Sequence, residues 1–185
     1  MGYTEALEKA WSEILSLTEE KRFSVKLLAD EYDINSEDKK ILSVSCNVPA
    51  KDYTSIILLH YLIQKAKLKT LPGPTGSWID FRQLEGGAGY YPAFKKRTID
   101  VILRKYGSRP ETLLDAANRF CAKKVQIGDL GLVIEPLERV PFLITISKGD
   151  EEFTPDANIL FDESIRQIFC TEDIVVLTEI VVHFL

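Results

Sequence analysis

The sequence predicts an α+β fold, in which an antiparallel sheet built from two hairpins packs against several helices in a single domain over residues 1–185. Runs of alternating apolar and polar residues indicate strands, and other runs repeat their apolar residues at helical spacing. No repeat, low-complexity tract or linker divides the chain. With 185 residues, 45% of them hydrophobic, the chain can bury one sizeable core.

Residues 1–20 carry the first predicted element, an amphipathic helix over 3–18 that packs on the domain. Its apolar residues recur at helical spacing between Glu and Lys, at Tyr3, Leu7, Trp11, Ile14 and Leu15. A strand pair follows, with a polar turn predicted over Asp33 to Asp38. The alternating residues of the two strands are Phe23, Val25, Leu27 and Ala29, then Leu42, Val44, Cys46 and Val48.

The middle of the chain predicts three helices. Asp52 is suited to cap a helix over 52–66, which is apolar nearly all round and therefore predicted to be buried. Pro92 suits the first turn of a helix over 92–106 that ends at a left-handed Gly107. Ser108 and Glu111 have the spacing of a capping box for a helix over 109–122.

A second hairpin and two closing helices complete the predicted fold. Two alternating runs flank the segment Glu135 to Arg139, which we expect to form the turn: Leu130, Leu132 and Ile134, then Val140, Phe142, Ile144 and Ile146. Asp162 and Thr171 are placed to cap the closing helices.

Charge and cysteine content exclude several classes of function. A net charge of -5 argues against a nucleic-acid-binding protein that neutralises phosphates. The chain shows neither a signal peptide nor an apolar stretch of the ~20 residues that cross a bilayer, so we expect a cytoplasmic protein without membrane contact. Cys46, Cys121 and Cys170 match no metal or disulfide pattern and are predicted to be buried thiols.

The segment from Thr75 to Arg97 is the candidate site. Five of the ten glycines and three of the eight prolines lie between Pro72 and Pro92, among several aromatic rings. The rings of this segment could wall a pocket in which Arg82 offers its planar donor fork to a small anionic ligand, either a carboxylate or a phosphate. These rings are Trp78, Phe81, Tyr90, Tyr91 and Phe94. The candidate ligand- or partner-binding residues are Trp78, Phe81, Arg82, Gly86, Gly87, Gly89, Tyr90, Tyr91 and Arg97.

Three interpretations of Gly86 to Gly89 stay open at this point. They are a tight turn that allows close packing, capture of an anion or cofactor at a helix start, and a protein-binding surface. The third glycine of GxGxxG is missing and no GK[ST] follows, so neither a dinucleotide site nor a P-loop is supported. A structural role for Arg82 is also open, through bonds to its own carbonyls or to Glu85.

No catalytic residue and no cofactor can be assigned in this chain. The acidic stretch Gly149 to Asp156 lacks EF-hand spacing, so we expect a metal-free turn in solvent. The alternative is a hydrolase-like metal-dependent enzyme, in which the fold gathers a carboxylate cluster from Asp129, Asp150, Glu152 and Asp162. No serine or cysteine nucleophile motif is present, and His60 is expected to be a hydrogen-bonded core residue.

Several motifs in order give the chain a family resemblance. They are Leu58-Leu-His-Tyr-Leu62, Gly76-Ser-Trp-Ile-Asp-Phe-Arg-Gln-Leu-Glu-Gly-Gly-Ala-Gly-Tyr90 with Phe94 and Arg97, Gly149-Asp-Glu-Glu-Phe153 and Ile159-Leu-Phe-Asp-Glu-Ser164. From about Asp30 onward the chain resembles the prokaryotic domain of unknown function 3786, which has no assigned activity.

The resemblance implies a setting rather than a reaction. Members occur in anaerobes, and some are joined to a cysteine-rich domain of the 4Fe–4S type, which implies iron–sulfur or corrinoid one-carbon enzymes as neighbours. Three scattered cysteines cannot hold such a cluster here. We therefore expect a non-catalytic binding or accessory module with a protein partner, either a metalloenzyme or an assembly factor.

Overall fold

The structure is a computed structural model that describes residues 3–150 and 152–185. It confirms the α+β class and the antiparallel strand pairing. The strands divide between a three-stranded sheet, β1-β2-β3, and a five-stranded sheet, β4-β8-β7-β6-β5. Internal contacts define two compact units, Met1–Pro72 and Gly73–Leu185. Single-domain behaviour of the whole chain stays a prediction.

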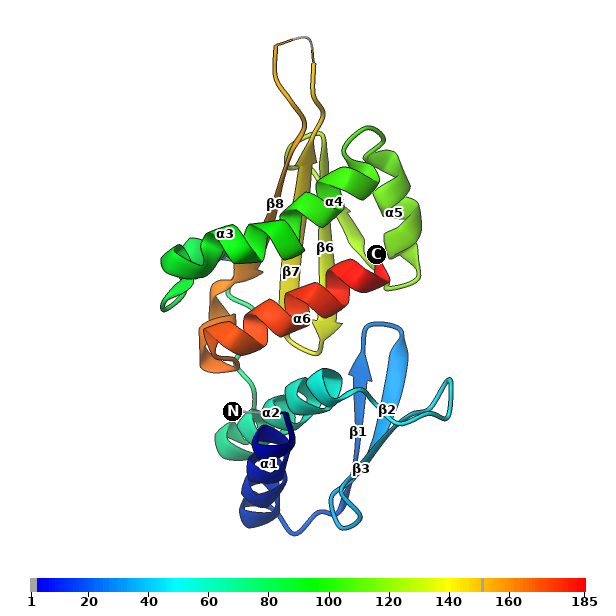
Figure 1. Cartoon of the computed structure of the whole chain (residues 1–185), viewed down its shortest axis with the longest axis vertical. Helices are drawn as coiled ribbons and strands as arrows, with labels where there is room; N and C mark the ends of the chain where they lie inside the picture. Colours follow the sequence, from blue (N-terminus) through cyan, green and yellow to red (C-terminus); the bar gives the residue numbers. More distant parts are fainter. Residues whose placement is uncertain (1–2, 151) are drawn as a thin grey trace. The chain divides into compact units, whose positions relative to one another are not determined.

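The first unit combines two helices with a three-stranded meander (Figure 1). Its elements are α1 (Tyr3–Leu17), β1 (Arg22–Leu27), β2 (Asp30–Asn35), β3 (Lys40–Ser43) and α2 (Asp52–Leu68). Helix α1 packs on α2, and Glu13 pairs with Lys67 at 2.6 Å. The predicted helix over 3–18 is therefore confirmed to within one residue.

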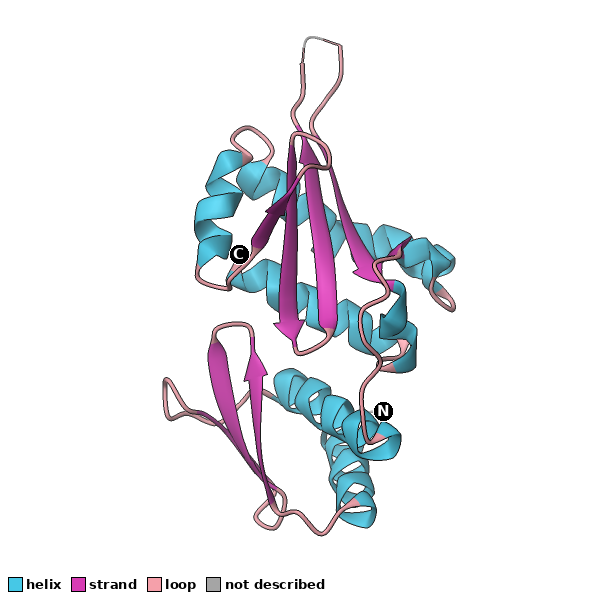
Figure 2. Cartoon of the chain, turned by 180° about the vertical axis from the view of Figure 1, so that it is seen from behind, coloured by secondary structure: helices cyan, strands magenta, loops and turns pink. Residues whose placement is uncertain are grey.

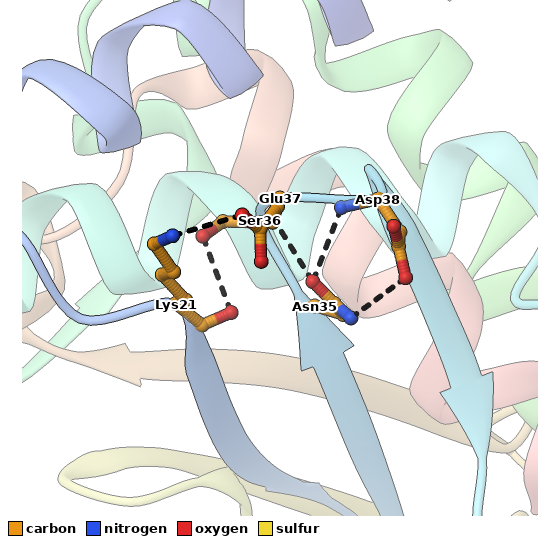
Figure 3. Close-up of polar contacts among 5 residues, drawn as sticks. All are labelled: Lys21, Asn35, Ser36, Glu37 and Asp38. Atoms are coloured by element: carbon orange, nitrogen blue, oxygen red, sulfur yellow. Dashed lines mark hydrogen bonds and ion pairs between the residues drawn. The ribbon is translucent and has the colours of Figure 1, made fainter.

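A strand occupies much of the segment predicted as a turn over 33–38. Strand β2 pairs with β1 on one side and β3 on the other, and the true turn follows Asn35. There the Asn35 Oδ1 accepts the backbone N–H groups of Glu37 and Asp38 at 3.0 and 3.1 Å, as Figure 3 shows. The prediction was wrong because Asp33 and Asn35 lie on the polar face of a strand, where the composition resembles that of a loop.

The second predicted strand, 42–48, is also shorter than expected. Strand β3 ends at Ser43, where the chain turns and Asn47 adopts a φ of 52°. The Asp30 carboxylate accepts Ser43 Oγ at 2.6 Å and Ser45 N at 3.3 Å, and these bonds stabilise the turn. Val44 and Val48 are consequently exposed.

Helix α2 confirms the predicted apolar helix over 52–66 and extends it to Leu68. Eight of its residues are buried, among them Ile57, Leu58 and Leu59 with no exposed surface. Asp52 is the first helical residue rather than the cap, since Lys51 occupies the N-cap position without a side-chain bond. Asp52 still favours the helix because a carboxylate near the N-terminus complements the dipole.

The second unit is a five-stranded antiparallel sheet with its helices on one face, as the two opposite views show (Figures 1 and 2). Inward residues of the central strands, such as Ile134, Phe142, Ile144 and Phe161, are fully buried. The elements in chain order are β4 (Trp78–Asp80), the 3-10 helix η1 (Phe81–Gln83), α3 (Gly87–Arg97), α4 (Ile99–Tyr106), α5 (Glu111–Asn118), β5 (Lys123–Val125), β6 (Leu130–Leu137), β7 (Val140–Ser147), β8 (Asp156–Asp162), the 3-10 helix η2 (Glu163–Gln167) and α6 (Thr171–Phe184).

The predicted helix over 92–106 is in fact two helices. Helix α3 begins at Gly87, so Pro92 lies inside it, and Thr98 separates α3 from α4. Gly107 adopts a right-handed φ of -59° rather than the predicted left-handed one. Glycine is favoured here because a Cβ at position 107 would lie only 2.6 Å from the Leu103 carbonyl oxygen.

Two other predicted caps differ from the structure. Helix α5 begins at Glu111 after Pro110, so the Ser108–Glu111 capping box does not form. Helix α6 begins at Thr171 with Cys170 at its N-cap, and the Thr171 hydroxyl does not cap the helix. Asp162 does cap as predicted, accepting Ser164 N at 3.0 Å at the start of η2.

The second hairpin is confirmed, with a tighter turn than predicted. Strands β6 and β7 pair from Leu130 to Leu137, with an irregularity before the turn, and Arg139 turns the chain at a φ of 64°. Strand β8 joins β7 on its other side, and the short strands β4 and β5 form the two edges. Those edge strands were missed because three residues are too few to show alternation.

The predicted burial of the cysteines is wrong: Cys46, Cys121 and Cys170 are all exposed. Their apolar sequence neighbours suggested burial, but each cysteine lies at a turn or a helix boundary, where the chain changes direction.

Among the described helices, none has both the length and the apolar character needed to cross a membrane.

Candidate functional site

The candidate segment forms a short edge strand, a 3-10 turn and a helix: β4, η1 and α3. Asp80 joins strand to turn through a capping box, in which it accepts Arg82 N at 2.7 Å while Gln83 Oε1 accepts Asp80 N at 2.7 Å. Sequence reasoning missed this box, although the Asp-x-x-Gln spacing is its usual signature.

Two of the predicted aromatic wall residues belong to the core. Phe81 and Phe94 are fully buried and stack with ring centroids 4.0 Å apart and planes within 3°. Phe94 then meets Phe161 of the sheet, which meets Phe142 edge to face at 4.9 Å. This row of rings fixes α3 on the sheet.

The guanidinium of Arg82 already has an acidic partner. Its Nε and Nη2 donate to the two carboxylate oxygens of Asp80 at 2.8 and 2.9 Å, and its Cζ lies 4.6 Å from the centre of the Tyr91 ring. The hydrogen bonds and charge of Arg82 hold the pKa of Asp80 below its ordinary value, although burial opposes the shift. The anticipated structural partners, Glu85 and local carbonyls, were therefore wrong.

Helix α3 carries both members of a second arginine–tyrosine pair. The Arg97 guanidinium is 5.4 Å from the centre of the Tyr90 ring, donates to the Tyr90 hydroxyl, and pairs with Glu179 of α6 at 3.0 Å. Tyr90 is 40% exposed, and the side chains of Arg82 and Arg97 are 57% and 48% exposed. Trp78 is half-buried at the sheet edge.

The three glycines have different roles. Gly86 has a left-handed φ of 70° and precedes α3. A Cβ on Gly87 would lie 2.0 Å from the carbonyl oxygen of Phe81, so this position allows the close packing that was one of the three interpretations. Open space surrounds the Cβ position of Gly89.

Neighbouring elements hold the segment in place. Arg166 donates to the carbonyl of Gln83 at 2.9 Å, and the Thr171 hydroxyl donates to the carbonyl of Glu85 at 2.7 Å. The connection before β4 is tethered by Asp162, which accepts the N–H groups of Thr75 and Gly76 at 3.0 and 2.7 Å. Sequence reasoning assigned Asp162 only as a helix cap or a metal ligand.

The structure does not assemble the alternative carboxylate cluster. Asp129 accepts Lys148 N at 2.7 Å, beside the end of β8 that begins with Asp156. Asp162 ends the same strand six residues later, roughly 20 Å away at about 3.3 Å per residue. Across residues 3–150 and 152–185, no three His, Cys, Asp or Glu side chains are grouped so that they could hold a metal.

Cys170 is unsuited to nucleophilic chemistry. Although Cys170 has exposed surface, protein groups around its sulfur desolvate the thiolate, and together with the nearby Asp173 and Glu172 they raise the pKa of this thiol to about 12. A thiol attacks as its thiolate, so a raised pKa leaves little of Cys170 in the reactive form near neutral pH.

We expect iodoacetamide at pH 8 to alkylate Cys170 much more slowly in the folded protein than in urea, by at least tenfold. Mass spectrometry of the Cys170 peptide over time measures this. Equal rates in the two states would show that the folded environment does not suppress the thiolate.

The second unit thus belongs to the class of α+β domains with helices on one face of an antiparallel sheet, and it exposes two arginine–tyrosine pairs on η1 and α3. The family model described as "Domain of unknown function (DUF3786)" matches residues 8–184. The chain belongs to this family. Neither a curated protein nor a solved structure matches the chain.

Proposed function

We propose that this protein is a non-catalytic binding or accessory module and that a protein partner docks on Arg82, Tyr90, Tyr91 and Arg97, here termed the Arg–Tyr surface. The observation that carries the proposal is the two arginine–tyrosine contacts, with Arg82 4.6 Å from the centre of the Tyr91 ring and Arg97 5.4 Å from that of Tyr90. The two arginine side chains are 57% and 48% exposed. Arginine and tyrosine are the residue types enriched in interface hot spots.

Preorganisation supports this function. The Arg82 side chain is held by Asp80 and Tyr91, and Arg97 by Tyr90 and Glu179, so their rotamers are ordered before a partner arrives. Binding then loses less side-chain entropy than it would with free arginines.

The hydrogen-bond geometry favours a protein over a small anion. The donor fork of Arg82 that would grip a carboxylate or phosphate already faces Asp80, which also neutralises much of its charge. The side chains of Arg82 and Arg97 nevertheless remain 57% and 48% exposed, beside the rings of Tyr91 and Tyr90. A partner backbone or aromatic side chain fits those groups better than a free anion does.

The nature of the partner rests on the family. The resemblance of this chain to domains that accompany cysteine-rich 4Fe–4S modules favours a metalloenzyme or its assembly factor in an anaerobic prokaryote. In this proposal the partner carries the metal and the chemistry, and the present chain supplies recognition.

We expect Arg82→Ala and Tyr90→Ala each to weaken partner binding by tenfold or more, and Arg82→Lys to weaken it as well, because lysine has no planar group to stack on Tyr91. Affinity purification from an anaerobic host identifies the partner, and titration of the purified pair measures the loss. Arg104→Ala, a change to an exposed arginine on α4, serves as the matched control.

Stability measurements separate binding from folding. The Arg82 side chain is 57% exposed and solvent screens its charge, so loss of the ion pair with Asp80 should lower the free energy of unfolding only slightly. If Arg82→Ala unfolds the protein while partner binding per folded molecule is unchanged, Arg82 is structural. A small-molecule turnover by the purified chain, without a partner, would replace this proposal with an enzymatic one.

A further inference from the structure

The connection between β7 and β8 carries a feature that the Arg–Tyr surface does not use. The two strands pair as far as Ser147 and Asp156, and the hairpin then extends beyond the sheet (Figures 1 and 2). Its base is anchored to other elements. Lys148 N donates to Asp129 at 2.7 Å, and the Lys148 ammonium lies 3.6 Å from the Glu111 carboxylate on α5.

Hydrogen bonds close the turn above this base. The Asp150 carboxylate accepts Glu152 N and Phe153 N, both at 2.8 Å, and Asp150 N donates to the Phe153 carbonyl at 2.9 Å. A Cβ on Gly149 would lie 2.6 Å from Pro155 Cδ and 2.8 Å from the Phe153 carbonyl oxygen. Gly149 therefore lies so close to Phe153 and Pro155 that a larger residue would not fit there.

This closed turn leaves a phenyl ring in solvent. Phe153 is 69% exposed, more than any other large hydrophobic residue among those the structure describes. The residue before it, Glu152, is exposed and forms none of the ion pairs found in the described chain, whereas Lys148 at the base of the hairpin is paired with Glu111. An isolated exposed apolar residue is ordinary on a protein surface, but here hydrogen bonds to Asp150 hold the backbone that carries the ring.

We propose that Phe153 is an anchor that inserts into an apolar pocket on a partner protein, and that lysine or arginine residues rim that pocket opposite Glu152. Aromatic anchors in desolvated pockets dominate the affinity of many interfaces, and rim charges of opposite sign steer association. A lipid surface fits the turn less well, since anionic headgroups repel an acidic rim. This surface is separate from the Arg–Tyr surface and does not depend on it.

Photo-crosslinking in the native host tests the anchor. The probe is p-benzoylphenylalanine, placed in the full chain at Phe153 and, as a control, at Ile127, which is 45% exposed in another turn of the same unit. We expect a discrete protein adduct from position 153 that is absent from position 127. Glu152→Lys should reduce this adduct, whereas Asp115→Lys, a charge reversal on the exposed face of α5, should leave it unchanged.

Titration of the purified adduct partner then measures the contribution of the ring. We expect Phe153→Ala to weaken binding at least tenfold with an unchanged melting temperature, and we expect added salt to weaken binding of the unaltered protein. Crosslinking that is equal at the two positions, absent at 153, or directed to lipid would overturn the proposal, as would equal affinities of Phe153→Ala and the unaltered chain.

Discussion

Replacing Gly87 with alanine should lower the free energy of unfolding by about 3 kcal/mol, at the upper end of overpacking effects. The new Cβ would lie 2.0 Å from the Phe81 carbonyl oxygen and 3.1 Å from its carbonyl carbon. Backbone atoms cannot move aside as a flexible side chain can, so η1 and α3 must separate. Chemical denaturation, followed by circular dichroism, measures the change.

Gly89→Ala is the matched control for this prediction. It lies two residues later in the same helix, and open space surrounds its Cβ position. Alanine has a higher helix propensity than glycine, so Gly89→Ala should be neutral or stabilise the protein by up to about 1 kcal/mol. Equal stability of the two variants would contradict the close contact at Gly87. Because η1 and α3 carry the Arg–Tyr surface, we expect Gly87→Ala also to reduce partner binding.

Asp162→Ala should destabilise the protein by about 3 kcal/mol or more. The Asp162 side chain is 1% exposed and accepts three backbone N–H groups, those of Thr75, Gly76 and Ser164. Each buried donor left without an acceptor costs on the order of 1–3 kcal/mol, of which water entering the site recovers a part. The denaturation midpoint reports the loss, with Asp156→Ala at the exposed start of the same strand as the control.

The same carboxylate makes stability depend on pH. Burial alone would raise the pKa of Asp162, but the bonds from Thr75, Ser164 and Gly76 bring it below its ordinary value. Because the pKa of Asp162 is lower in the folded state, its ionised carboxylate adds to the free energy of unfolding. This stabilisation is fully present above the unfolded pKa of about 4 and is lost as the pH falls through the folded pKa. The acid sensitivity of unfolding should therefore decrease in Asp162→Asn. An unchanged pH profile below pH 4 would show that other carboxylates dominate.

The candidate site shows where inference from sequence stops. Glycines and aromatic rings between Pro72 and Arg97 marked the segment correctly as one of special backbone shape. Their individual roles depend on contacts: Phe81 and Phe94 turned inward, and Gly87 met a carbonyl oxygen. The Asp80 capping box could be predicted from its spacing. The hydrogen bond from Thr75 N to Asp162, 87 residues later in the chain, could not.

The sequence by itself determined the α+β class, the first helix, the apolar helix α2 and the hairpin of β6 and β7. Each of these has a local cause, because apolar periodicity over eight or more residues is visible in the chain and reports which face is buried. The ordered motifs of the sequence also indicated the family that the family model matches.

Only the tertiary structure decided how the strands divide between two sheets, that Pro92 lies within a helix, and which partners the charged groups have. Short edge strands such as β4 are stabilised by pairing with distant strands rather than by their own residues. Likewise, Arg82 stacks on Tyr91 because η1 and α3 pack together. For such contacts, the separation of two residues along the chain does not predict their distance in space.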